Sequence, residues 1–275
     1  MNKSLSIVCL LLASLTLLTG PNPPETEDTQ SDLEKWVESD PLEVGSRRWS
    51  AANHDRDEWI VTLAMGHPQA RLKNHKDDIP VPLPFKIEAG PAKEGLHGRR
   101  QIVKVSDGWI VGFNAGEWGG GLWWFSPDGK QRYKIAKARV QGFVETKQGL
   151  LVMEGLAHIS TFEGTIMTIK KNQNNKWESK ILIDIKDKPN VWVHFEDDTL
   201  LLATTNRLLK VVPDTKEIEV IADNMFWIGL YPNSMVITRG GVIYVGMRHG
   251  VAKIEREVGK ARIHWLLPKK EPDEK

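Results

Sequence analysis

The sequence predicts an all-β fold, a β-propeller that most simply has five blades of four strands each. Residues 101–268 divide into four segments that can be laid over one another, and each contains four short apolar or alternating runs. The turn after the first run falls at Gly108, Gly149, Asp198 and Gly241, which are 41, 49 and 43 residues apart. A repeat of about 40 to 45 residues with four strands is typical of propeller blades.

Radial packing explains why such sheets occur together. One four-stranded sheet cannot bury both of its apolar faces alone, whereas neighbouring blades cover both. Residues 48–98 supply a degenerate fifth blade, with a strand over 57–64. The segment 79–87 alternates Pro with apolar residues, so we expect it to be extended and not a central strand. A four-bladed ring with an N-terminal extension and an irregular β-sandwich are the alternatives.

The first 20 residues indicate the compartment. A basic start at Lys3 leads into an apolar run, 5–18, which is too short to span a bilayer and is typical of a secretory signal peptide, with a short uncleaved anchor as the alternative. The sole cysteine, Cys9, lies inside that run, so the mature chain would have none, as suits an oxidising compartment. We therefore expect a periplasmic or secreted protein with no membrane span once the signal is removed.

Composition sets the remaining boundaries. Residues 21–45 carry eight acids and one base, which predicts a disordered acidic linker. The propeller domain is expected over 46–268, and residues 269–275 are expected to be a disordered tail.

The charge balance and residue counts exclude several classes of function. With 37 Lys and Arg against 36 Asp and Glu, the net charge is +1, which argues against a nucleic-acid partner. One cysteine rules out a disulfide scaffold and a multi-cysteine zinc site, and the eight histidines form no HExxH motif. No cofactor is predicted, although a divalent cation such as calcium stays an open candidate.

Three segments carry a resemblance to known proteins. PDGK (127–130), YPNS (231–234) and TRGGVIYVGMRHGVAKIE (238–255) resemble secreted bacterial β-propellers. The likeness covers roughly 101–268 and implies the fold alone, because propellers host hydrolases, lyases, transferases and binding modules.

Ligands of propellers usually sit at one mouth of the central axis. A charged or amide side chain has no use inside a blade unless it is hydrogen-bonded, so such residues are the site candidates. Glu145, His194 and Asn233 are expected on or just before inner strands, in contact with a ligand. A supporting set is expected on second strands or the loops after them: Asn114, Glu154, His158 and His249.

Two narrower resemblances suggest enzymes. The Pro-Asn of segment 231–234 resembles the Pro-Asn-Gly of calcium-dependent lactonase propellers, the regucalcin and paraoxonase group, although Ser234 stands where that family has Gly. That likeness implies Asn233 as a metal ligand, with assistance from Asn114, Glu145 or Glu154. Gln141-Gly142 followed by Glu154 resembles propeller-type glutaminyl cyclases, which implies Glu154 as a general acid or base.

One aromatic side chain completes the candidates. Trp118 stands beside Glu117 at a glycine-rich turn, where a flat ring and a carboxylate could hold a sugar or a peptide. The sequence leaves open whether the protein is an enzyme. We expect a binding module for a small molecule or an envelope protein, and the alternative is a propeller enzyme with an axial site.

Overall fold

The computed structural model contains five antiparallel sheets arranged as a five-bladed β-propeller, which confirms the all-β class and the blade number. The structure describes residues 31–269 except 89, 160, 258 and 259. The expected signal peptide, 1–20, and nearly all of the expected tail lie outside the described residues. In the part that is described, no helix is long and apolar enough to span a membrane.

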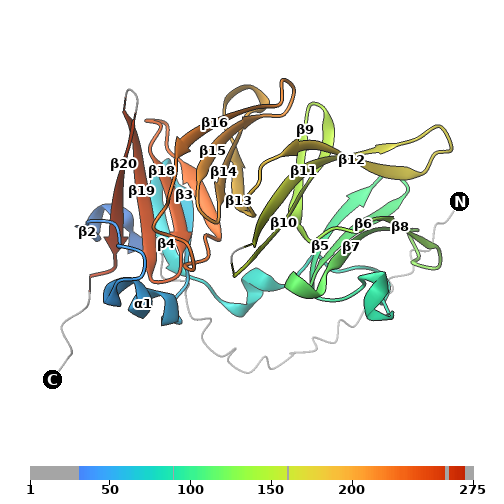
Figure 1. Ribbon diagram of the computed structural model, residues 1–275, viewed down its shortest axis with the longest axis horizontal. Helices are drawn as coiled ribbons and strands as arrows, with labels where there is room; N and C mark the ends of the chain where they lie inside the picture. Colours follow the sequence, from blue (N-terminus) through green and yellow to red (C-terminus); the bar gives the residue numbers. More distant parts are fainter. Residues whose placement is uncertain (1–30, 89, 160, 258–259, 270–275) are drawn as a thin grey trace, which may run out of the picture.

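Each of the four later blades contains four consecutive strands, and Figure 1 shows them following one another from green to red. The second blade comprises β5 (Arg99–Val105), β6 (Gly108–Asn114), β7 (Gly120–Phe125) and β8 (Arg132–Ala136). The third comprises β9 (Val140–Thr146), β10 (Gly149–His158), β11 (Thr161–Lys171) and β12 (Trp177–Asp184). The fourth comprises β13 (Pro189–His194), β14 (Leu200–Thr204), β15 (Leu208–Val212) and β16 (Glu217–Ala222). The fifth comprises β17 (Ser234–Ile237), β18 (Ile243–Met247), β19 (Gly250–Glu257) and β20 (Lys260–Leu267).

The predicted turns lie where the repeats place them, between the first and second strands of these blades. Gly108, Gly149 and Gly241 have positive φ angles of 153°, 107° and 78°. Asp198 also adopts a positive φ, of 66°. Gly and Asp tolerate this region better than other residues, which explains why these types recur at the turns.

The first blade is built from two distant pieces of chain. Strands β3 (Trp59–Ala64) and β4 (His67–Leu72) form a hairpin, and β1 (Ser31–Asp32) pairs with β4. A little further along, β2 (Val37–Ser39) pairs with β20 of the fifth blade. The N-terminal segment 31–39 therefore joins the first blade to the last, and we call it the clasp.

The expectation of a disordered linker over 21–45 is wrong for its described part. Leu33 and Trp36, both in the clasp, are 3% and 8% exposed, and Leu42 is 5% exposed. Leu33 and Trp36 pack in a cluster with Val61 and other residues of the first and fifth blades. The two neighbouring sheets bury these apolar side chains. The free energy gained by that burial outweighs the cost of ordering a segment rich in acids.

Helical structure is short and lies in the segments that connect strands. Helix α1 (Arg47–His54) is capped by Ser46, whose hydroxyl accepts a hydrogen bond from the amide of Trp49. The 3-10 helices are η1 (Leu33–Lys35), η2 (His75–Asp78), η3 (Ala92–Glu94), η4 (Gly116–Trp118) and η5 (Glu196–Asp198). Of these, η2 and η3 belong to the connection between the first and second blades, which the sequence repeat does not cover.

The inner strands β3, β5, β9, β13 and β17 position the site. Strand β17 contacts both β3 and β13, and β5 contacts β9. Between β9 and β13, Gly142 leaves room for the ring of Trp192. Because every inner strand opens its blade, the five strand beginnings lie at one mouth of the propeller, and the turns that follow them lie at the other.

Candidate functional site

A polar cavity of about 340 Å³ opens where the five inner strands begin, and we call it the axial cavity. Each blade contributes a residue that lies within one position of the start of its inner strand. These residues are Glu58, Arg99, Gln141, Asn190 and Asn233. A propeller brings equivalent positions of all blades to the axis, so five residues far apart in sequence share one cavity.

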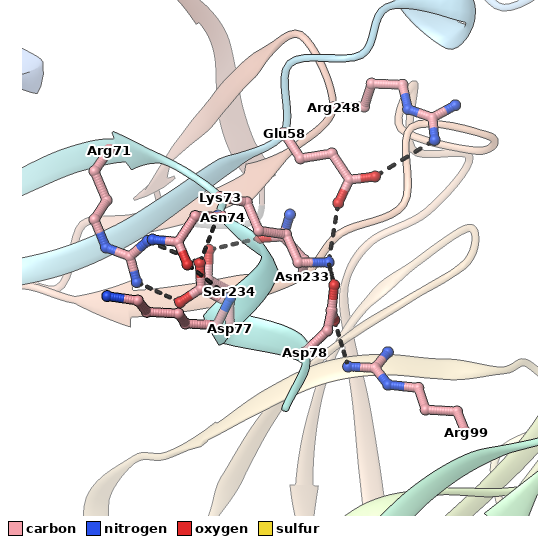
Figure 2. A network of polar contacts seen from close by, with 11 residues as sticks. Glu58, Arg71, Lys73, Asn74, Asp77, Asp78, Arg99, Asn233, Ser234 and Arg248 are labelled. Atoms are coloured by element: carbon pink, nitrogen blue, oxygen red, sulfur yellow. Dashed lines mark hydrogen bonds and ion pairs between the residues drawn. The ribbon is translucent and has the colours of Figure 1, made fainter. Parts of the chain in front are cut away.

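A chain of alternating charges lines one side of the axial cavity (Figure 2). Glu58 accepts from Arg248, with 3.4 Å between Oε1 and Nη2, and lies 3.3 Å from Lys73 Nζ through Oε2. Lys73 Nζ is also 2.8 Å from Asp78 Oδ2, and Asp78 Oδ1 is 3.3 Å from Arg99 Nη2. These five side chains come from the fifth blade, the first blade, the second blade and the connection between the first and the second. Their contacts therefore hold this side of the mouth together.

Two pKa shifts follow from this arrangement. Burial alone would lower the pKa of Lys73, but its contacts with Asp78 and Glu58 outweigh burial, and the pKa is raised. Two hydrogen bonds from Arg71 hold the pKa of Asp77 at about 2. Asp77 also accepts from the amide of Asn74, which fixes η2 at the rim of the cavity.

Lys188 stands apart from this network. It lines the axial cavity between the third and fourth blades, and within the described part of the chain no carboxylate lies within ion-pair distance of its ammonium group. Burial lowers the pKa of Lys188, the guanidinium of Arg99 lowers it further, and the neighbouring Asp187 partly offsets both effects. The ammonium group therefore lacks the counter-ion that a partly buried charge requires.

Two further donors at the wall have no acceptor among the described residues. They are Asn233 Nδ2 and Arg248 Nε, and both are enclosed. Both side chains make hydrogen bonds through another atom. Asn233 Oδ1 accepts from the Ser234 hydroxyl at 2.8 Å, and Arg248 Nη1 donates to the carbonyl of Asn53 at 2.6 Å. The wall therefore offers donors in excess of acceptors.

The supporting candidates lie at the same end of their blades as the cavity, but each has a local partner. Asn114 Oδ1 accepts from the amide of Gly116 at 2.9 Å. Glu154 accepts from the amide of Arg139 at 3.3 Å and from the hydroxyl of Thr165 at 3.2 Å. Neither Asn114 nor Glu154 lines the axial cavity.

The two histidines of that set are likewise paired. His158 Nε2 lies 3.0 Å from Glu117 Oε2 at the rim, and His249 Nδ1 contacts Asp55 at the end of α1. No cavity among the described residues is lined by both histidines, and the axial cavity is lined by neither.

Glu145 and His194 lie at the opposite mouth, so the expectation that they share a site with Asn233 is wrong. Each is exposed and stands at the end of an inner strand, paired with the start of the next strand at Leu150 and Leu200. Four residues along a strand span about 13 Å, the distance that separates Glu145 from Gln141 in the cavity. Of the seven candidates, only Asn233 lines the axial cavity.

Trp118 is 65% exposed and lies beside a shallow hollow of about 300 Å³, next to Glu117 and His158. This position agrees with a surface role, which stays a prediction. Among the described residues, no group of three or more His, Cys, Asp and Glu is arranged to hold a metal ion. The calcium hypothesis for Asn233 therefore gains no support from its neighbours.

Sequence reasoning missed most of the cavity. Glu58, Lys73, Asp78 and Lys188 lie in or beside connections between blades, and Arg99 begins the second blade. The one signal available was position: like Asn233, both Arg99 and Glu58 stand where an inner strand begins.

Comparisons with known proteins find distant structural likeness alone. No family model and no curated protein matches the chain. Virginiamycin B lyase from Staphylococcus aureus is 12% identical, with a TM-score of 0.38, and the match covers 60% of this chain and 54% of the lyase. The extracellular domain of BT4673 from B. thetaiotaomicron is 11% identical, with a TM-score of 0.42 and coverage of 62% and 22%. A proposed gluconolactonase is 11% identical, with a TM-score of 0.36 and coverage of 78% and 80%.

The chain therefore spans about half the length of the lyase that it matches. Identities of 11–12% and TM-scores below 0.5 carry no argument about ligand or activity.

Proposed function

We propose that this chain is a ligand-binding propeller module, acting outside the cytoplasm, whose axial cavity holds a small molecule through a carboxylate or similar anionic group. The apolar run at 5–18 supports the compartment. The observation that carries the ligand class is the unpaired ammonium group of Lys188 at the cavity wall.

The charge of the lining favours an anion. Four cationic side chains, those of Lys73, Arg99, Lys188 and Arg248, face the axial cavity. Three carboxylates oppose them, and one of these, Asp77, is already neutralised by Arg71. The excess of two positive charges matches a dicarboxylate or a comparable anion.

Hydrogen bonding points the same way. Asn233 and Arg248 each keep an enclosed donor without an acceptor, and a buried unpaired donor costs about 1–3 kcal/mol. A carboxylate has only acceptors to offer, so small rotations of these side chains toward it would satisfy both donors. A cationic ligand would leave them unpaired and would face repulsion from Lys188.

Calorimetric titration with succinate tests this proposal. Removing one charged donor to a carboxylate costs about 1.5–3 kcal/mol, so Lys188→Gln and Arg99→Gln should each weaken binding about tenfold or more. The control is Lys147→Gln, which alters an exposed lysine at the opposite mouth, just after β9. The proposal fails if succinate, citrate and phosphate all leave the wild-type chain without a heat of binding at millimolar concentration. It also fails if both cavity variants bind as the control does.

A further inference from the structure

A second cavity, of about 220 Å³, adjoins the axial cavity, and we call it the side cavity. Lys188, Asn190, Tyr231 and Pro232 line both cavities and so form their common wall. A ligand that meets Lys188 in the axial cavity is therefore within reach of the side cavity.

The two cavities differ in chemistry. The axial cavity is lined mainly by charged and amide side chains, whereas most of the side cavity is apolar. Trp227 is fully buried at the side cavity and is held there by a 3.0 Å hydrogen bond to the carbonyl of Thr204. Phe162 and Ile159, from the β10–β11 hairpin, are 37% and 88% exposed.

The backbone supplies an independent indication. Ile159 and Tyr231 both line the side cavity, and both have left-handed backbones, with φ of 53° and 55°. A β-branched residue in this region is strained, and such strain gathers at ligand clamps. Here the strained residue is Ile159, whose 88% exposed side chain lines the side cavity and gains nothing from that position unless something covers it, whereas the ring of Tyr231 already lies 4.6 Å from the guanidinium of Arg248.

We propose that the ligand is amphipathic: a carboxylate with an apolar tail of aryl or medium-chain alkyl type, whose head lies in the axial cavity and whose tail fills the side cavity. This inference rests on the proposed anion site and adds the second half of the ligand. Lys188 lines both cavities, so it joins the charged network of the axial cavity to the side cavity that Phe162 lines. Drug-sized ligands occupy pockets of about 300–1,000 Å³, so the side cavity of about 220 Å³ suits a tail and not a whole ligand.

Titration of the full chain with matched carboxylates tests the tail separately from the head. Acetate reports the head alone, and 3-phenylpropionate adds a phenyl tail. Burying such a group should tighten binding by about tenfold or more. Phe162→Ala should remove most of that gain and leave the affinity for acetate unchanged. Ile181→Ala, which alters a 67% exposed side chain on β12, is the matched control and should change neither affinity.

The outcomes separate the inference from the proposed function. Equal affinities for acetate and 3-phenylpropionate, or a Phe162→Ala variant that behaves as Ile181→Ala does, would overturn the amphipathic ligand while leaving the anion site intact. Binding of the neutral 3-phenylpropanol as tightly as the acid would show that the tail site works without Lys188, and that too would overturn the proposed link. Failure of every carboxylate to bind would refute the proposed function itself.

Discussion

Lys73 and Asp78 form an ion pair with 2.8 Å between Nζ and Oδ2, at the junction of the first blade and the connection to the second. The pair is one link of the charge chain in Figure 2, so it both holds the mouth of the propeller and contributes to the charge of the axial cavity. The two roles can be separated by substitution.

Asp78→Asn should affect stability and binding in opposite directions. The Asp78 side chain is 46% exposed, and exposed pairs contribute about 0.2–1 kcal/mol, so the free energy of unfolding should fall by about that amount. Affinity for succinate should rise, because one carboxylate leaves the cavity. Urea unfolding and calorimetry measure the two effects. Weaker succinate binding in this variant would contradict the assigned charge balance.

The clasp should be essential to stability. Trp36 is 8% exposed, and its indole Nε1 donates a hydrogen bond to Ser31 Oγ at 2.8 Å. Its ring packs edge-on against that of Trp59, with 4.7 Å between the ring centroids. Trp36→Ala should therefore cost about 3–5 kcal/mol. Trp118→Ala, at a 65% exposed tryptophan, is the control and should cost little. If urea unfolding gave equal losses, residues 31–39 would be no part of the folded unit.

The turn at Gly241 should resist substitution for a backbone reason alone. Gly241 has a φ of +78°, and no atom lies within 4 Å of where a Cβ would stand. Gly241→Val should cost about 1–3 kcal/mol through strain. Gly240→Val is the neighbouring control, since Gly240 has no positive φ and similar space. A larger loss at Gly240 would mean that the turn is misplaced.

Acid should unfold the protein partly through Asp77. Its folded pKa of about 2 lies below the ordinary value of 3.8, so its stabilising effect is present above about pH 4 and is lost as the pH falls toward 2. Asp77→Asn should be less stable than wild type at neutral pH, and this difference should shrink on acidification. Urea midpoints at pH 6, 4 and 3 measure it. A difference that is constant with pH would show that the carboxyl is not perturbed.

The blades could be predicted from the sequence because turn chemistry repeats. Gly108, Gly149 and Gly241 occupy positions that need a positive φ, and central strands such as β14 and β18 are apolar runs buried on both faces. The clasp could not, because β1 and β2 are only two and three residues long and gain stability from sheets that are distant in sequence. Leu33 and Trp36 stand in a segment with eight acids, and two apolar residues alone do not make a pattern that predicts a strand.

The site was less predictable for a geometric reason. A repeat register says which residues lie on inner strands, but a strand has two ends, and Glu145 and His194 stand at the end remote from Asn233. Lys73, Asp78 and Lys188 fall in or near connections, where no periodicity marks them. Only the closed arrangement of five blades brings them together.

The position of a bound anion tests the central claim most directly. A crystal structure of the full chain with bromosuccinate would locate the bromine by its anomalous signal. The account predicts a bromine peak in the axial cavity, with carboxylate oxygens within hydrogen-bond distance of Lys188 Nζ and of a guanidinium nitrogen of Arg99 or Arg248. A peak at the opposite mouth beside Glu145 and His194, or an axial cavity that holds only water at saturating bromosuccinate, would contradict it.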